Sequence, residues 1–231
     1  MHSARSAPIA ADRLVRAYLT AKRHVVDGGY DHEVAWQLKA AGGPVTTARF
    51  VEEAAWVVLS AGMRESVVRS VFPRIAAACG GFEPAWAAQH RAAARRACLD
   101  AFGHEAKIDA ILDIAARAAV LGDDGVRAAL ADPEPFLRSL PYVGPVTWRH
   151  LAKNLGAPVA KADRHLVRLA AAAGRSSVDV MCEEIGGWLG EPVAVVDIVL
   201  WRWSVLHAQD CREPCDGLPH RPTGRSPQDS A

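Results

Sequence analysis

Apolar residues recur at every third or fourth position along most of this chain, which is the spacing of one face of an α-helix. In residues 13–26 that face carries Leu14, Tyr18 and Ala21. The same spacing appears over residues 48–60, 104–121, 163–173, 177–188 and 192–207. No hairpin dipeptide stands between two runs of alternating apolar and polar residues, which would indicate paired strands. The pattern therefore predicts an all-α protein of about ten helices.

Proline and glycine divide the region after residue 130 into a short helix, a turn and a second helix. The first helix is predicted over 133–140, and Pro141 ends it because proline lacks a backbone amide. Gly144 in the turn permits a positive φ and a close approach of another backbone. A second helix is predicted over 146–155, and Gly156 suits the position just beyond its C-terminus.

This turn has the features of a phosphate-binding site. The amides near Gly144, Val146 and Thr147 have no partner inside the predicted helix, and they stand at the positive end of its dipole. Six basic residues and a single acid, Asp163, lie between positions 141 and 175. The basic residues are Arg149, Lys153, Lys161, Arg164, Arg168 and Arg175. A basic patch beside a helix N-terminus indicates contact with a nucleic-acid backbone.

Together these motifs resemble the helix-hairpin-helix DNA glycosylase superfamily. The hairpin is Leu-Pro-Tyr-Val-Gly at 140–144, and Asp-Arg-His-Leu-Val-Arg at 163–168 is similar to the Asp-x-His-(Val/Ile)-x-Arg of that family. Residues 50–75 resemble the early helix pair of the family, and residues 104–115 resemble the helix that leads toward the hairpin. The resemblance extends over roughly residues 45–206.

The resemblance implies a two-lobed helical fold with a DNA-binding cleft between the lobes. We expect one lobe to combine residues 10–39 with 126–207, and the other to hold residues 40–125. The ends, residues 1–9 and 208–231, are rich in Pro, Ser, Gly and charge. We expect both ends to be flexible.

Asp163 is the catalytic residue that the resemblance implies. Cleavage of the bond between a base and deoxyribose develops oxocarbenium character, which a nearby carboxylate stabilises while it orients water. Asp163 also suits the N-cap of the helix predicted over 163–173. Contacts to the DNA backbone are expected from six residues, namely Tyr142, Gly144, Val146, Thr147, Arg164 and His165.

Strand-cleaving members of the family carry a lysine two residues after the hairpin glycine. Here that position is Val146, so the resemblance implies a monofunctional enzyme that uses water and leaves an abasic site. Lys153 and Lys161 are alternative amines, which would either support Asp163 or give the protein lyase activity.

Other residues are candidates for opening the duplex and for holding the extruded base. Gly62 stands where one branch of the family has an intruding glutamine, so Met63 and Arg64 are candidates for intrusion, Met63 as an apolar wedge. A flipped base requires stacking faces and hydrogen-bonding edges. The candidates for this base pocket are Tyr30, Trp36, Gln37, Trp148 and Asp197. Asp197 has the alternative of pairing with a cation inside an apolar helix.

The cysteine pattern argues against an iron–sulfur cluster. The tail carries His207, Cys211, Cys215 and His220, which falls short of the four cysteines of the cluster-binding branches. Two cysteines and two histidines are ligand types for tetrahedral zinc, so this set is a weak zinc candidate. We expect no cofactor.

Composition is consistent with an intracellular protein. The 231 residues are 50% hydrophobic and 23% charged, with a net charge of +1. The N-terminal residues lack a signal-peptide pattern, and no apolar run reaches the ~18–20 residues of a membrane span. Five cysteines suit a reducing compartment. We expect a cytoplasmic, nucleoid-associated monomer.

The expected partner is double-stranded DNA containing a modified base, and the expected reaction is hydrolysis of the N-glycosidic bond. Three alternatives remain beside repair by a monofunctional enzyme: a combined glycosylase and lyase, a glycosylase acting on a modified base of foreign DNA, and a non-catalytic helix-hairpin-helix DNA-binding module. A helical zinc protein that makes protein contacts is a more distant alternative. The residues do not identify the base.

Overall fold

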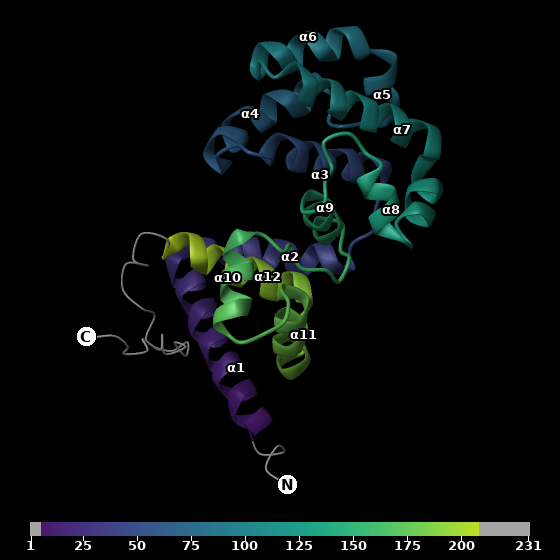
Figure 1. The fold of residues 1–231 in the computed structure, drawn as a ribbon. Helices are drawn as coiled ribbons and strands as arrows, with labels where there is room; N and C mark the ends of the chain where they lie inside the picture. Colours follow the sequence, from purple (N-terminus) through teal and green to yellow (C-terminus); the bar gives the residue numbers. More distant parts are fainter. Residues whose placement is uncertain (1–5, 208–231) are drawn as a thin grey trace, which may run out of the picture.

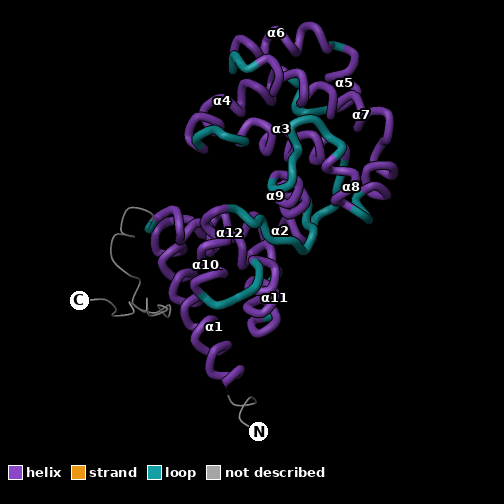
Figure 2. Tube along the Cα trace, in the orientation of Figure 1, coloured by secondary structure: helices purple, strands orange, loops and turns teal. Residues whose placement is uncertain are grey.

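The computed structural model describes residues 6–207, and the backbone in this range is helical, without a strand (Figure 1, Figure 2). Twelve α-helices and one π-helical turn follow one another, so the all-α prediction is confirmed for this range. None of these helices has both the length and the apolar character that crossing a membrane requires. Residues 1–5 and 208–231, which include most of the two ends expected to be flexible, lie outside the described range.

The first of two hydrophobic cores is built by seven consecutive helices. Its largest buried side chains include Phe50, Leu59, Ile75, Ile111 and Leu151. The helices are α3 (Thr47–Ser60), α4 (Glu65–Ala78), α5 (Pro84–Gln89), α6 (Arg91–Ala101), α7 (Glu105–Ala129), α8 (Pro133–Arg138) and α9 (Thr147–Asn154).

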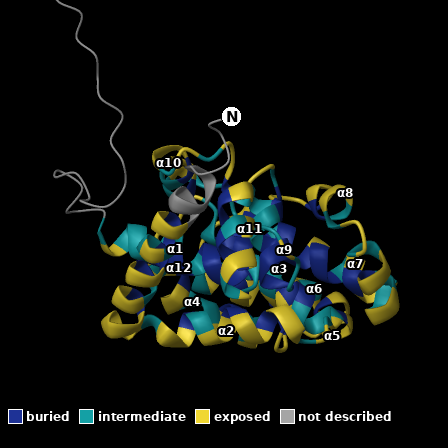
Figure 3. Ribbon diagram, turned by 90° about the horizontal axis from the view of Figure 1, so that it is seen from below, coloured by how far each residue is buried: buried dark blue, intermediate teal, exposed yellow. Residues whose placement is uncertain are grey.

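The second core brings the start of the chain against its C-terminal helices. Tyr18, Leu166, Ile185 and Val199 are among its buried residues. The elements on this side are α1 (Ser6–Val25), the π-helical turn (Val26–Tyr30), α2 (Asp31–Gly42), α10 (Arg164–Ala172), α11 (Val178–Leu189) and α12 (Val193–Leu206). In Figure 1, α1 and α10–α12 form a body separate from α3–α8, with α2 and α9 between the two. The buried faces of the helices turn inward (Figure 3).

The boundary between the cores lies later in the chain than we expected. Residues 126–207 were assigned to one lobe, but Leu137, Leu140 and Leu151 belong to the first core together with α3 and α7. The reason is that α9 packs against α3 as well as α8, so its apolar residues complete the first core. The second core resumes at Ala160 and Leu166.

The hairpin before α9 differs from the predicted turn at one position. The residue with positive φ is Tyr142, at 63°, and it is one of only two such non-glycine residues in the described range. Gly144 does not adopt a positive φ. Gly156 does, at 95°, just beyond the C-cap Leu155, as predicted.

Gly156 also marks a close approach between α2 and the end of α9. A Cβ atom added at this residue would lie 2.7 Å from the carbonyl oxygen of Ala40. Arg49 reinforces the same junction, because its Nη2 donates to the carbonyl oxygens of Ala40 at 3.2 Å and Asn154 at 3.0 Å. The two helices that lie between the cores are therefore joined at their C-terminal ends.

We expect Gly156→Ala to destabilise the protein more than Gly174→Ala. Both residues have positive φ, which costs a residue with a Cβ about 1–2 kcal/mol, but a Cβ at Gly174 would meet no atom within 4 Å. The clash with Ala40 should add about 1–3 kcal/mol. Urea unfolding of the two variants measures the difference. If both variants lose the same free energy of unfolding, the α2–α9 junction accommodates the added Cβ atom without destabilising the protein.

Candidate active site

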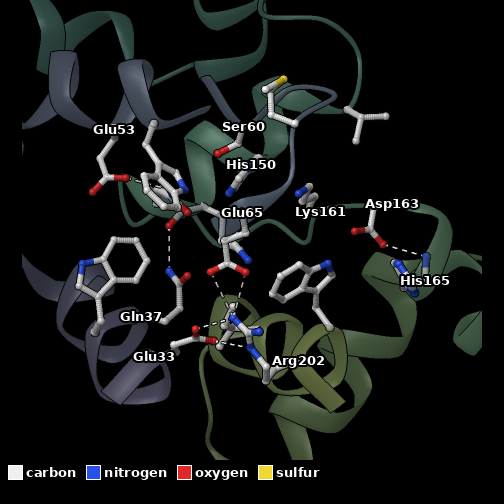
Figure 4. A pocket seen from close by; sticks show the side chains of 18 of the residues that line it. Glu33, Gln37, Glu53, Ser60, Glu65, His150, Lys161, Asp163, His165 and Arg202 are labelled. Atoms are coloured by element: carbon white, nitrogen blue, oxygen red, sulfur yellow. Dashed lines mark hydrogen bonds and ion pairs between the residues drawn. The ribbon is translucent and has the colours of Figure 1, made fainter. Parts of the chain in front are cut away.

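A pocket of about 940 Å³ is lined by residues from both cores (Figure 4). The side chains come from α2, α3, α4, α9 with its N-cap Val146, and α12, from the turn between α3 and α4, and from the segment 161–165. Nine of the residues predicted from the sequence line it: Trp36, Gln37, Met63, Val146, Lys153, Lys161, Asp163, Arg164 and His165.

Asp163 is the N-cap of α10, as predicted, and it also lines the pocket. Its Oδ1 accepts hydrogen bonds from the amides of His165 at 2.9 Å and Leu166 at 3.2 Å. Its Oδ2 accepts no hydrogen bond from the described residues. The cap therefore fixes the carboxylate through one oxygen and leaves the other available to a ligand in the pocket (Figure 4).

Asp197, a candidate for the pocket wall, lies behind that wall and anchors it. It forms an ion pair with Lys153, and the two side chains are 1% and 4% exposed. Its Oδ2 also accepts a hydrogen bond from the Lys161 amide at 2.6 Å. The burial of these charges is compensated because each has a partner. Asp197 thus ties α9 and the backbone that precedes Asp163 to α12.

Lys161 has an environment that favours its neutral amine. Burial lowers the pKa of Lys161, and the charge of Lys153 lowers it further, against the opposing effects of Asp163, Asp197 and Glu65. The Lys161 Nζ lies 6.0 Å from the ring centroid of Trp201. Burial also lowers the pKa of His150 well below its usual value, with the charges of Lys161 and Lys153 acting in the same direction. The imidazole is therefore neutral at physiological pH.

A network of charged side chains crosses one side of the pocket and joins α2, α4 and α12. Arg202 donates to Glu33 through Nε at 2.8 Å and through Nη2 at 2.5 Å. The same Nη2 lies 3.3 Å from Glu65, which also pairs with Arg69 at 2.6 Å. Acidic and basic side chains alternate in this network of four residues, and each is bonded to at least one other. Their positions are therefore fixed before any ligand binds.

The last turn of α9 organises a second polar group in the pocket. Gln37 donates from Nε2 to the Lys153 carbonyl at 3.1 Å, whereas its Oε1 is buried and has no partner among the described residues. Such an acceptor costs about 1–3 kcal/mol when it stays unpaired. Glu53 accepts from the Asn154 Nδ2 at 2.9 Å. Burial raises the pKa of Glu53 to about 7, despite the hydrogen bond from Asn154.

The turn predicted to enter DNA is held in place by Lys107. Its Nζ donates to the carbonyl oxygens of Leu59 at 2.8 Å and Ala61 at 2.6 Å, at the end of α3. Burial lowers the pKa of Lys107. Met63 follows this end and lines the pocket, whereas Arg64 is the N-cap residue of α4 and does not line it.

The hairpin contributes only Val146 to the pocket lining, and one of its amides is occupied. The Gly144 amide donates to Thr147 Oγ1 at 2.6 Å, which corrects the expectation that this amide has no partner. Tyr142 is exposed and packs edge-on against His104, with ring centroids 6.1 Å apart. Gly144, Tyr142 and Thr147 therefore lie outside the pocket lining.

Two aromatic candidates for the base pocket are engaged elsewhere. The guanidinium of Arg202 lies 4.4 Å from the Tyr30 ring centroid. Trp148 is buried in the first core, and Arg149 lies 5.0 Å from its ring. Trp36, by contrast, lines the pocket and is 43% exposed.

Several pocket residues were not among the predicted site residues, although one signal distinguishes some of them. Glu53 and Arg202 are charged residues within strongly apolar stretches, as Asp197 is. This signal singled out Asp197, and applied to the other two it would have found both. His150 carries no comparable signal, since it follows Arg149 in a polar part of α9.

Within residues 6–207 no group of three or more His, Cys, Asp or Glu side chains is arranged to hold a metal ion. Of the zinc candidates, His207 stacks on Trp203 with ring centroids 4.8 Å apart. Cys211, Cys215 and His220 lie outside the described residues.

Comparisons with family models, with curated proteins and with solved structures found no match for this chain. The geometry of the pocket and the chemistry of its residues therefore carry the functional inference.

We expect Glu53→Gln to remove a pH dependence of stability. The folded-state pKa of about 7 exceeds the ordinary value of 4.5, so Glu53 favours folding at low pH, and this contribution is lost as the pH rises through 7. Between pH 5 and pH 8 the wild type should therefore lose about 2–3 kcal/mol relative to the variant. Urea unfolding at both pH values measures the change. A constant difference between the proteins would show that Glu53 titrates normally.

Proposed function

We propose that this protein is a DNA glycosylase that hydrolyses the bond between a modified base and its deoxyribose. The observation that carries the proposal is the Asp163 carboxylate, fixed by two backbone amides through one oxygen, while the other oxygen has no hydrogen-bond partner among residues 6–207 and Asp163 lines the pocket. A DNA-binding module without catalysis would use this carboxylate only as a helix cap, and the remaining oxygen would repel phosphate.

Asp163 would act on the sugar. As the base departs, positive charge develops at C1′ and the ring oxygen, and a fixed carboxylate stabilises that charge without reorganising. The same oxygen can accept a proton from the attacking water, while the base leaves with the electrons of the glycosidic bond. Val146 occupies the position of the family's lysine nucleophile, which supports water as the nucleophile.

The walls of the pocket suit an extruded base. Trp36, Trp56 and Trp201 line it, and flipped bases are commonly stacked against aromatic side chains. Met63, in the turn held by Lys107, would fill the space left in the duplex. Arg164 and His165 and the amides at the start of α9 would hold phosphates. These assignments agree with a two-lobed helix-hairpin-helix glycosylase fold that binds duplex DNA across both cores.

We expect Asp163→Asn to abolish excision with little change in folding. Asparagine caps helices about as well as aspartate, whereas its amide cannot stabilise the cationic sugar or accept a proton from water. The rate of base excision should fall at least about 100-fold. The assay uses duplexes that each carry one modified base: uracil, an alkylated purine, 8-oxoguanine or a hypermodified pyrimidine. Hot alkali then cleaves the strand at abasic sites.

Asp123→Asn is the matched control for this assay. Asp123 also accepts a hydrogen bond from a helix N-terminus, the Thr47 amide at 2.8 Å, but it does not line the pocket. This variant should excise at the wild-type rate. Full activity of Asp163→Asn would refute the assigned role, and DNA binding without excision of any base would favour the non-catalytic module.

A second candidate function, with added lyase activity, is favoured by one observation on Lys161. Its lowered pKa increases the fraction of neutral amine at the pocket, whereas Lys153 is held in a buried ion pair. The Lys161 amine would attack C1′, displace the base and form an imine with the opened sugar. Loss of the 3′ phosphate by β-elimination would then cut the strand.

The two candidates differ in one measurable product. In the monofunctional reaction, strand cleavage requires alkali, and borohydride traps no covalent complex. If Lys161 is the nucleophile, wild-type protein should give a trapped complex that Lys161→Arg loses, while Lys22→Arg, remote from the pocket, retains it. Trapping that survives in Lys161→Arg would exclude Lys161 as the nucleophile.

A further inference from the structure

One corner of the pocket carries an excess of hydrogen-bond acceptors. Gln37, Glu52 and Glu53 line it, together with Trp36, and Figure 4 shows Gln37 and Glu53 on the side away from Asp163. Gln37 and Glu53 are both fixed to the last turn of α9, through the Lys153 carbonyl and the Asn154 side chain. These bonds hold the two side chains on one short stretch of wall.

The acceptors of this corner are only partly satisfied within the described residues. Gln37 is fully buried and its Oε1 accepts no hydrogen bond. Neither Glu52 nor Glu53 forms an ion pair there. Asn154 donates to only one oxygen of Glu53, at 2.9 Å. A buried acceptor that the fold leaves unpaired is a position where a water molecule or a ligand can supply the donor.

Nearby positive charges are directed elsewhere. Arg49, the cation closest to Glu53 in sequence, donates to the carbonyl oxygens of Pro44, Ala40 and Asn154. The ammonium of Lys153 is paired with Asp197. The corner also faces the C-terminal end of α9, which is the negative end of the helix dipole. Its electrostatic field therefore favours a cation.

We propose that this corner binds a positively charged, N–H-donating group carried by the base that the enzyme removes. The proposal rests on the glycosylase function and deepens it by naming the substrate class. Gln37 Oε1 and the Glu53 carboxylate would accept from the N–H groups, and the exposed face of Trp36 would stabilise the charge by a cation–π contact. Glu52 would add to the attraction.

The size of the pocket fits this class. Its volume of about 940 Å³ lies near the upper end of the ~300–1,000 Å³ that drug-sized ligands occupy, so it has room for more than an unmodified base. A neutral pyrimidine also has N–H groups for these acceptors, but it gains neither the attraction of the Glu52 and Glu53 side chains for a positive charge nor the cation–π contact with Trp36. Discrimination against such bases therefore rests on charge.

Two kinds of modified base supply this chemistry. One is a purine whose ring is made cationic by alkylation, as in 7-methylguanine, and the other is a pyrimidine with a pendant ammonium, as in 5-aminomethyluracil. The matched neutral bases are 8-oxoguanine and 5-hydroxymethyluracil. Each pair has similar size and differs in charge, so a preference within a pair reports on the corner.

The test measures the affinity of the Asp163→Asn protein for duplexes that carry each of these four bases, because this variant binds without turnover. We expect the charged member of at least one pair to bind about 10–100-fold more tightly, the usual effect of a hydrogen bond to a charged group. Preference for the aminomethyl base alone identifies a pendant ammonium as the target, and preference for 7-methylguanine alone identifies ring charge.

Two further substitutions in the same background test whether the corner causes this preference. Glu53→Gln and Gln37→Met should each reduce the preference for the charged base at least about threefold. Asp113→Asn, which removes an exposed acid outside the pocket, should leave the preference intact. Thermal unfolding confirms that each variant is folded. A preference that survives both corner substitutions would overturn the inference.

Failure of the inference is distinguishable from failure of the proposed function. If charged and neutral bases bind equally and the wild type excises either of them, the inference of a cation-binding site is wrong. The proposed glycosylase function is then still supported. If no base is excised by the wild type and none is preferred over unmodified duplex, the proposed function itself fails. Preferential excision of the charged base by the wild type, weakened in Glu53→Gln, supports both.

Discussion

The geometry of the pocket depends on the buried ion pair between Lys153 and Asp197. Lys153 lies on α9, whose apolar residues belong to the first core, and Asp197 lies on α12, whose apolar residues belong to the second, so their pairing is a direct electrostatic link between the two. Breaking such a pair leaves an uncompensated charge, at a cost of about 3–5 kcal/mol. Because Asp197 also holds the Lys161 amide, the same interaction sets the path of the chain into Asp163.

The rest of the site follows from what this link brings together. The segment that leads into α10 presents Asp163 from one side, and the end of α9 presents Gln37 and Glu53 from the other. Each of these groups is held by backbone amides, a carbonyl or a neighbouring side chain rather than by solvent. A site organised in this way can discriminate charge, because its dipoles do not need to reorient when a ligand arrives.

Local features of the sequence were enough to predict most of the helices and the cap. The helix expected over 163–173 is found as Arg164–Ala172 with Asp163 capping it, and Gly156 terminates α9 with positive φ. These features depend on residues close together in the chain, such as an acid two residues before the amide it accepts from. The helices for which no range was predicted include α5 at Pro84–Gln89, which offers too few turns for a periodic pattern, and also the longer α2 and α6.

The pairings across the pocket were not predictable in the same way. Arg202 and Glu33 are 169 residues apart, and Gln37 is 116 residues from Lys153, so nothing in either local sequence identifies the partner. The Gly144 amide illustrates a smaller failure. Its predicted availability overlooked the Thr147 hydroxyl three residues later, which satisfies it at 2.6 Å. The catalytic assignment of Asp163 remains a proposal from the family resemblance and the cap geometry.

The division into two cores has a consequence for the order in which the chain acquires structure. The first core is continuous in sequence, from α3 to α9, whereas the second pairs α1 with α10–α12. During synthesis the apolar face of α1 therefore stays exposed until α10–α12 have been made. Contacts between residues far apart in sequence form late, because the entropy cost of closing the long loop between them comes before the contacts stabilise the structure. Because the pocket takes side chains from both sides, we expect it to be the last part of the molecule to assemble.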